Sequence, residues 1–131
     1  MVLSVVAIVM SRSEGGSGGG GGDAGPTSDL ALSAVEFAFE PDTWTIVADT
    51  EASVTMNNDG AVEHNWTVLE SGVSISSEAD YDPATVVAAT DDIAGGESGT
   101  AAVTLPAGTY QVICTIAGHF DSGMAGTLTA A

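Results

Sequence analysis

The stretch "TYQVICTIAGHFDSGMAGTLTAA" (109–131) decides the fold of this chain. It begins with alternating residues that place Tyr110, Val112 and Cys114 on one face, which is typical of a half-buried strand. Its end, rich in Thr and small residues, predicts another strand. The Gly-containing segment between them predicts a connecting loop. The sequence therefore predicts a strand–loop–strand unit, with the only cysteine of the chain where the loop begins.

The same alternation recurs upstream of this unit. The segments that we predict to form short strands are "VEFAFEP" (35–41), "TWTIVA" (43–48), "ASVTM" (52–56), "HNWTVLE" (64–70) and "SGTAAVTL" (98–105). In the first of them, Val35, Phe37 and Phe39 are expected to share one buried face of the strand.

Residues 71–95 interrupt this pattern, because most of them are small or polar. We expect a short helical or irregular insertion there, with Asp82 as a helix cap and Pro83 as the first residue of a short helix that continues through "ATVVAAT" (84–90). The whole domain then contains about seven to eight short strands and no long helix, which predicts an all-β fold, a Greek-key β-sandwich.

Three segments of the chain differ in composition. Residues 1–12 contain an apolar run that is too short to span a bilayer, and we interpret them as the remnant of a signal peptide or anchor that starts before Met1. Residues 13–29 form a Gly/Ser-rich linker that should act as a flexible tether. Residues 30–131 form the single domain. This order predicts export to the periplasm or the outer face of the cytoplasmic membrane, with membrane contact only through the N-terminal tether.

The charge balance of the chain is strongly negative. There are 18 acidic residues against a single basic residue, Arg12, and the net charge is −17 at pH 7. Such a surface repels nucleic-acid phosphates and anionic lipid, so the sequence argues against both as partners. It would attract a basic protein. Adaptation to high salt explains the same composition, and the two interpretations are compatible.

Four residues offer metal-binding atoms: His64, Cys114, His119 and Met124. Taken alone, each is more commonly an ordinary core residue. Together they are more informative, because a tight loop joins Cys114 to His119, Met124 begins the next strand, and His64 starts a strand that can reach the same point. Two imidazoles, one thiolate and a weak thioether are the ligand set of a blue-copper electron-transfer site. Zinc fits less well, because a thioether is a poor donor for it.

The signatures of an enzyme are missing. One cysteine cannot form a binuclear copper site with bridging thiolates, and two histidines cannot also supply a second, catalytic copper. The chain has no Gly-x-Ser-x-Gly motif and no phosphate-binding loop. Asp121 is the only feature that supports a Cys/His hydrolase. The sequence therefore predicts that the protein is not an enzyme.

Two stretches resemble a known family. "HNWTV" (64–68) resembles the first copper motif of the azurin-like cupredoxins, which are blue copper proteins. "GESGTAAVTLPAGTYQVICTIAGHFDSGMAGTLTA" (96–130) is similar to the C-terminal third of auracyanins. The spacing between His119 and Met124 fits auracyanin rather than azurin. The resemblance implies a cupredoxin fold for residues 30–131.

The resemblance also implies roles for individual residues. His64, Cys114 and His119 would be the equatorial ligands of one type 1 copper, which cycles between Cu(I) and Cu(II), and Met124 would be its axial ligand. Asn65 would join the two ligand-bearing loops by hydrogen bonds across the site, and such contacts keep metal ligands oriented.

This chain departs from the family pattern in its ligand loop. The family usually has Pro-Gly-His there, whereas this chain has Ala117, Gly118 and His119. Losing the proline should loosen the loop in the unfolded state, which affects loop rigidity and the reduction potential but not the ligand set. The absence of Lys and Arg after residue 12 is a second departure, and it leaves the docking partner open.

The function implied by the resemblance is that of a tethered, monomeric electron carrier. It would shuttle one electron between redox proteins with a basic docking face, such as a cytochrome c or a membrane electron-transfer complex. The alternative is a copper-binding or copper-delivery module without redox shuttling. Two other interpretations are a copper domain of a nitrite reductase or multicopper oxidase, and a cupredoxin that has lost its metal.

Overall fold

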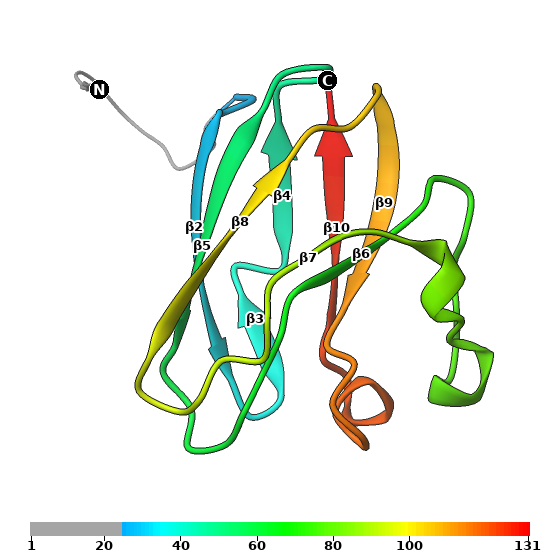
Figure 1. The fold of residues 1–131 in the computed structure, drawn as a ribbon. Coiled ribbons are helices and arrows are strands. Elements are labelled where there is room, and N and C mark those ends of the chain that lie inside the picture. Colours follow the sequence, from blue (N-terminus) through cyan, green and yellow to red (C-terminus); the bar gives the residue numbers. More distant parts are fainter. Residues whose placement is uncertain (1–24) are drawn as a thin grey trace.

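The computed structural model describes residues 25–131, which form two β-sheets packed face to face (Figure 1). The predicted anchor remnant at 1–12 and residues 13–24 of the predicted linker lie outside the described residues. Strand pairing begins at Thr27, which forms a bridge with Ile46. None of the helices in the described part has the length and apolar character needed to cross a membrane.

Nine strands make up the two sheets in the described residues. The first sheet has the order β3 (Ala38–Glu40), β2 (Asp29–Val35), β5 (Ala52–Asn58) and β8 (Ser98–Val103). The second has the order β4 (Thr43–Ile46), β10 (Ala125–Ala130), β9 (Gly108–Ile113), β6 (Thr67–Leu69) and β7 (Val86–Ala89). Neighbouring strands are antiparallel, except that β2 is parallel to β5 and β4 is parallel to β10. The predicted Greek-key sandwich is confirmed, with slightly more strands than we expected.

The core lies between the two sheets and is filled by every second residue of each strand. In β5, Ala52, Val54 and Met56 are fully buried. In β9, Tyr110 and Val112 are buried, as the alternation predicted. Each large apolar side chain that is fully buried stabilises the fold by about 1.5–3 kcal/mol. The sandwich is thus a rigid support for the loops at its ends.

The stretch at 35–41 is not the single strand that we predicted. β2 ends at Val35, and the chain turns before β3 begins at Ala38. Phe39 is buried as predicted, whereas 41% of Phe37 is exposed. The physical reason is that side chains keep to one face at every second residue only while the strand is continuous. The turn breaks this period and moves Phe37 out of the core.

The predicted insertion at 71–95 is irregular except for four residues, Val86–Ala89, which form β7. Asp82 caps a single 3₁₀ turn, η4 (Pro83–Thr85), because its side chain accepts a hydrogen bond from the N–H of Ala84 at 2.9 Å. The cap prediction is therefore confirmed, but the helix ends after that turn. The next four residues pair with β6 and form β7 instead. Strand pairing here overrides a weak local helix preference.

The insertion covers the outer face of the second sheet. Ile75 packs against Leu69 of β6 and Ile113 of β9, and these three residues form a second apolar cluster outside the main core. All three residues of β6 are therefore buried. This cover matters for the site, because it lies beside the loop that follows β9.

Three of the connections at one end of the sandwich bear on the site. They are the turn between β2 and β3, the loop between β5 and β6, and the loop between β9 and β10 (Figure 1). The C-terminus lies at the opposite end. The end where these connections meet carries all of the candidate ligands.

Candidate metal centre

The β9–β10 loop brings three candidate ligands together. Cys114 follows β9 directly and is fully buried. His119 precedes a 3₁₀ turn, η5 (Phe120–Ser122), which ends at Gly123 in the left-handed region (φ 108°) that glycine adopts without strain. This reversal returns Met124 to the site, where its N–H donates to the carbonyl of His119 at 3.1 Å. The carbonyl of Met124 accepts a hydrogen bond from the N–H of Cys114 at 3.3 Å. Met124 is fully buried as well.

His64 reaches the same place from the β5–β6 loop. The strand that we predicted from residue 64 begins only at Thr67, and His64 instead forms an isolated bridge with Ile93. The buried side chain of Asn58 orders the loop by donating to the carbonyls of Val62 at 2.8 Å and Ile93 at 2.7 Å. His64 is held in a fully buried position by these backbone contacts.

The donor atoms of these residues converge on one point. His64 Nδ1 lies 3.2 Å from His119 Nδ1, and His119 Nδ1 lies 3.4 Å from Cys114 Sγ. One ligand atom from each of the three residues lies within 4.8 Å of the others, and all three residues are buried. Two imidazole nitrogens and one sulfur at this spacing can bind a single metal ion.

The environment sets the protonation of the ligands before metal binding. Burial raises the pKa of the Cys114 thiol, although the N–H groups of Asn65 and Ile116 oppose this effect. Burial, and then the neighbouring His64, lower the pKa of His119. The metal-free site therefore favours the thiol form of Cys114 and the neutral imidazole of His119. A metal that binds Cys114 as a thiolate must displace its proton.

Asn65 joins the two ligand-bearing loops. Its side-chain amide donates to Thr115 Oγ1 at 2.8 Å, and its Oδ1 accepts from the N–H of Thr115 at 3.0 Å. The backbone N–H of Asn65 also points to Cys114 Sγ at 3.5 Å. The side-chain amide also donates to Asp92 Oδ1 at 2.8 Å. These hydrogen bonds are of the cross-site kind that the resemblance implied for Asn65.

The site also contains a carboxylate that the sequence analysis missed. Glu36, at the turn after β2, places Oε2 at 2.7 Å from His64 Nε2. Its Oε1 accepts a hydrogen bond from the N–H of Ala61 at 2.8 Å. The bond from Ala61, followed by that from His64, lowers the pKa of Glu36 below its usual value of 4.5. Glu36 is 28 residues away from His64 in the sequence, so no local motif indicates the contact.

A second missed carboxylate holds the other ligand loop. Glu78 opens the 3₁₀ turn η3 (Glu78–Asp80) and accepts hydrogen bonds from the N–H groups of Gly118 at 3.0 Å and Asp121 at 3.2 Å. Asp121 returns the contact by accepting from the N–H of Glu78 at 3.0 Å. These donors, Gly118 first, lower the pKa of Glu78 below 4.5. We call the hydrogen bonds that join Glu78 to Gly118 and Asp121 the Glu78 clamp.

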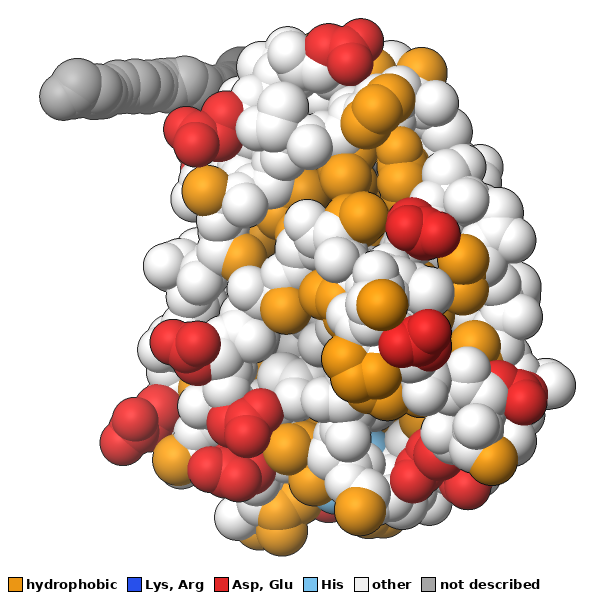
Figure 2. Space-filling view, turned by 45° about the vertical axis from the view of Figure 1, so that its right-hand side comes forward, with side chains coloured by type: hydrophobic (Ala, Val, Ile, Leu, Met, Phe, Trp, Pro, Cys, Tyr) orange, Lys and Arg blue, Asp and Glu red, His pale blue; other side chains and the backbone are white. Residues whose placement is uncertain are grey.

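The surface over His119 is partly apolar. The ring of Phe37 lies 4.9 Å from the ring of His119, and only 8% of His119 is exposed. Figure 2 shows acidic side chains on both sides of the end where the histidines lie, and no Lys or Arg on that face. A small apolar contact area therefore lies within an acidic surface.

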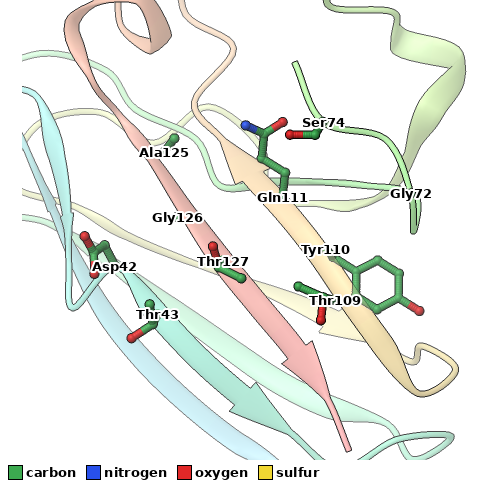
Figure 3. Close-up of a pocket in the computed structure, with 10 residues that line it drawn as sticks. All are labelled: Asp42, Thr43, Gly72, Ser74, Thr109, Tyr110, Gln111, Ala125, Gly126 and Thr127. Carbon is green, nitrogen blue, oxygen red and sulfur yellow. The ribbon is translucent and has the colours of Figure 1, made fainter. Parts of the chain in front are cut away.

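A separate groove of about 490 Å³ lies away from these ligands, on the outer face of β9 and β10 (Figure 3). Figure 3 shows Gln111 of β9 extending toward Ser74 of the insertion, with Thr109 and Thr127 further along the groove. None of the four candidate ligands lines this groove. The groove is therefore not part of the candidate metal centre.

Comparisons with known proteins agree with this geometry. The model of the family "copper binding proteins, plastocyanin/azurin family" matches residues 27–131. Auracyanin-A of Chloroflexus aurantiacus is 32% identical over 141 aligned positions, which cover 91% of this chain and 87% of that protein. Auracyanin-B of the same organism is 29% identical over 137 positions, which cover 91% of this chain but only 58% of that protein. A solved structure of auracyanin B matches with a TM-score of 0.70 and 27% identity, over 81% of this chain and 90% of that one.

The residues present fit the metal that this family binds. Two buried imidazoles and one buried thiol converge, and a buried thioether follows in the same loop. This donor set suits copper, which accepts both nitrogen and soft sulfur ligands. The chain therefore belongs to the plastocyanin/azurin family of copper-binding proteins, as a blue copper protein similar to the auracyanins.

Proposed function

We propose that this protein is a single-copper electron carrier that passes one electron at a time between two redox proteins. The observation that carries the proposal is the buried cluster of His64, Cys114 and His119, whose ligand atoms lie within 4.8 Å of one another. In this role the three residues are the equatorial ligands and Met124 is the axial ligand.

The bound copper would supply the one-electron couple between Cu(I) and Cu(II). The residues of the chain hold the donor atoms in place and keep water away from them. Asn65 ties the His64 loop to the Cys114 loop, and the Glu78 clamp holds the segment around His119. A site whose loops are tied in this way changes little in shape during electron transfer, so little energy is needed for reorganisation.

Phe37 and His119 suggest the place where partners dock. The imidazole of His119 is a ligand that lies just beneath the surface, in contact with the half-exposed ring of Phe37. A partner that packs on Phe37 comes within a few side chains of the metal. The acidic surface around this end would steer a partner with a basic docking face, such as a cytochrome c or a basic domain of a membrane complex.

Export and tethering are part of the proposal. They are supported by the apolar run within residues 1–12 and by the Gly/Ser-rich composition of residues 13–29. A flexible tether of this kind would allow the domain to move between two partners at one membrane surface.

The alternative, a copper-delivery module, finds less support. Delivery sites release copper readily and commonly use exposed methionines, whereas Met56 and Met124 are both fully buried. An enzyme with a second copper is not supported either. Both histidines and the only cysteine of the chain lie in one cluster, so none of them is left to build another site.

The test is a visible absorption spectrum of the full chain after addition of Cu(II). We expect a strong thiolate-to-copper band that disappears when ascorbate reduces the metal. The band should be absent from the Cys114→Ser variant, because serine supplies no thiolate. A folded wild-type protein without this band would contradict the proposal. Copper that leaves within seconds in the presence of a chelator would favour the delivery alternative.

A further inference from the structure

Glu36 contacts His64, one of the candidate metal ligands, and no sequence motif indicates this contact. Its carboxylate lies on the side of the His64 ring opposite the metal site: Oε2 is 2.7 Å from Nε2, while Nδ1 is 3.2 Å from His119 Nδ1. The ring is fully buried, and the side chain of Glu36 is 29% exposed. Glu36 therefore contacts the metal only through His64.

The backbone around Glu36 has room for this contact. The N–H of Ala61 donates to Oε1 at 2.8 Å and fixes the carboxylate from the other side. Gly60 lies directly over the pair, and a Cβ at this position would overlap Oε2 of Glu36 and approach His64 Nε2 to 3.1 Å. The loop between β5 and β6 thus forms a small cradle that only a glycine at position 60 leaves open.

The contact decides which imidazole nitrogen is available to a metal. A carboxylate accepts hydrogen bonds, so Nε2 of His64 must carry the proton that it donates to Glu36. In a neutral imidazole, Nδ1 then has a free lone pair. Nδ1 is the nitrogen that lies close to His119.

We propose that Glu36 is the positioning residue of the copper site, which fixes His64 in the Nε2–H tautomer and directs the free Nδ1 lone pair to the metal. This role rests on the copper site proposed above. Carboxylates that hold a metal-bound histidine in this way raise the basicity of the imidazole as well as fixing its orientation. Glu36 also places a negative charge near the site, which favours Cu(II) over Cu(I).

The first test uses the metal-free full chain, so that it does not depend on copper. Long-range ¹H–¹⁵N NMR correlations of the imidazoles should show His64 as the single Nε2–H tautomer in the wild type. Glu36→Ala should give a mixture of tautomers. Glu36→Gln has one acceptor oxygen for two donors, the N–H of Ala61 and Nε2–H of His64, so it should favour the wild-type tautomer less strongly than Glu36 does but more strongly than Glu36→Ala. Gly60→Ala leaves Glu36 in the sequence but displaces its carboxylate, and it should behave like Glu36→Ala.

The second test measures copper in the same proteins. We expect Glu36→Ala and Gly60→Ala to weaken copper binding by about 10-fold to 100-fold and to shift the visible band. Glu36→Gln should weaken copper binding less, and its reduction potential should rise because a negative charge is lost. Glu63→Gln is the matched control. Glu63 is exposed and precedes His64 in the sequence, so this substitution also removes one negative charge close to His64. Its binding and tautomer should match the wild type.

The outcomes separate this inference from the proposed function. If the wild type has no thiolate-to-copper band, the proposed function fails, while the tautomer test still decides the role of Glu36. If Glu36→Ala and Gly60→Ala keep a pure Nε2–H tautomer, the positioning role is wrong. It is also wrong if both variants bind copper as tightly as Glu63→Gln does.

Discussion

At the scale of single residues, Met124, the proposed axial ligand, is the residue through which the chain could adjust its copper most easily. The three other ligand residues contribute the nitrogen and thiolate donors that bind either oxidation state, whereas a thioether contributes a weak axial bond. The backbone of Met124 is fixed by hydrogen bonds to Cys114 and His119, so its position does not depend on the metal.

We predict that Met124→Leu keeps the blue colour and raises the reduction potential. Leucine has a similar volume and fills the same buried space, but it offers no donor to stabilise Cu(II). Cyclic voltammetry measures the shift. Met56→Leu is the control, because Met56 is equally buried but lies in β5. An unchanged potential in Met124→Leu would show that Met124 is a core residue only.

At the scale of structural elements, the Glu78 clamp supplies rigidity to a loop that lacks the usual proline. Ala117 stands where the family has proline, so the backbone of the loop is freer before folding. In the folded protein, both oxygens of Glu78 hold N–H groups of this loop. An element in the insertion thus stabilises the segment that carries His119.

We predict that Glu78→Gln loosens this loop without unfolding the domain. An amide has one acceptor oxygen, so it cannot hold both N–H groups as the carboxylate does. Hydrogen exchange at Gly118 and Asp121 should become faster, and copper should dissociate faster. Glu70→Gln, which changes an exposed glutamate outside the clamp, should change neither rate. Unchanged exchange at Gly118 would argue against the clamp.

The clamp should also respond to pH. The folded-state pKa of Glu78 is lowered from 4.5, so its contribution to stability is present above that value and is lost as pH falls through the lowered pKa. We predict that the difference in free energy of unfolding between wild type and Glu78→Gln is larger at about pH 6 than at about pH 3. Urea unfolding of the metal-free proteins measures it. Equal differences at both pH values would rule out this linkage.

The packing between the sheets gives a prediction for stability. Leu128 of β10 is fully buried between the sheets, and its neighbour Thr127 is exposed. Leu128→Ala should lower the free energy of unfolding by about 2–5 kcal/mol, because it leaves a cavity in a packed core. Thr127→Ala should change it by about 0.5 kcal/mol or less. Similar losses in the two variants would show that this part of the interface is loosely packed.

At the scale of the whole molecule, charge dominates the behaviour of the surface. The net charge is −17, and Arg12 is the only basic residue. This excess attracts basic proteins over distances comparable to the Debye length, which is about 10 Å at 0.1 M salt. The small apolar area at Phe37 lies within this acidic surface, which is why we propose it as the docking contact.

We predict that electron transfer to a basic cytochrome c slows by about tenfold or more as salt rises from low to physiological concentration. Stopped-flow absorbance at the copper band measures the rate. A neutral small-molecule oxidant should show almost no salt dependence, which separates steering from a direct effect on the copper site. A flat salt profile with the cytochrome would remove the steering part of the proposed function.

The sequence by itself determined the class of fold, the ligand types and the charge. These features are local: alternation within strands reports burial directly, and Cys114, His119 and Met124 lie in one short loop whose two ends are fixed by neighbouring strands. Even Asn65, which acts across the site, stands next to a ligand and shares its motif.

The tertiary structure alone decided which other residues support the site. Glu36 contacts the His64 ring across 28 residues of sequence, and Glu78 contacts the His119 loop across 40. A single glutamate in a turn shows no sequence pattern that predicts such a partner. The same holds for Phe37, which a turn moved from the core to the surface over His119, and for β7, where pairing with β6 replaced a predicted helix. Periodicity reports which face of a strand is buried. Contacts between distant segments depend on how the sheets and loops come together, and that information is not present in any one stretch of the chain.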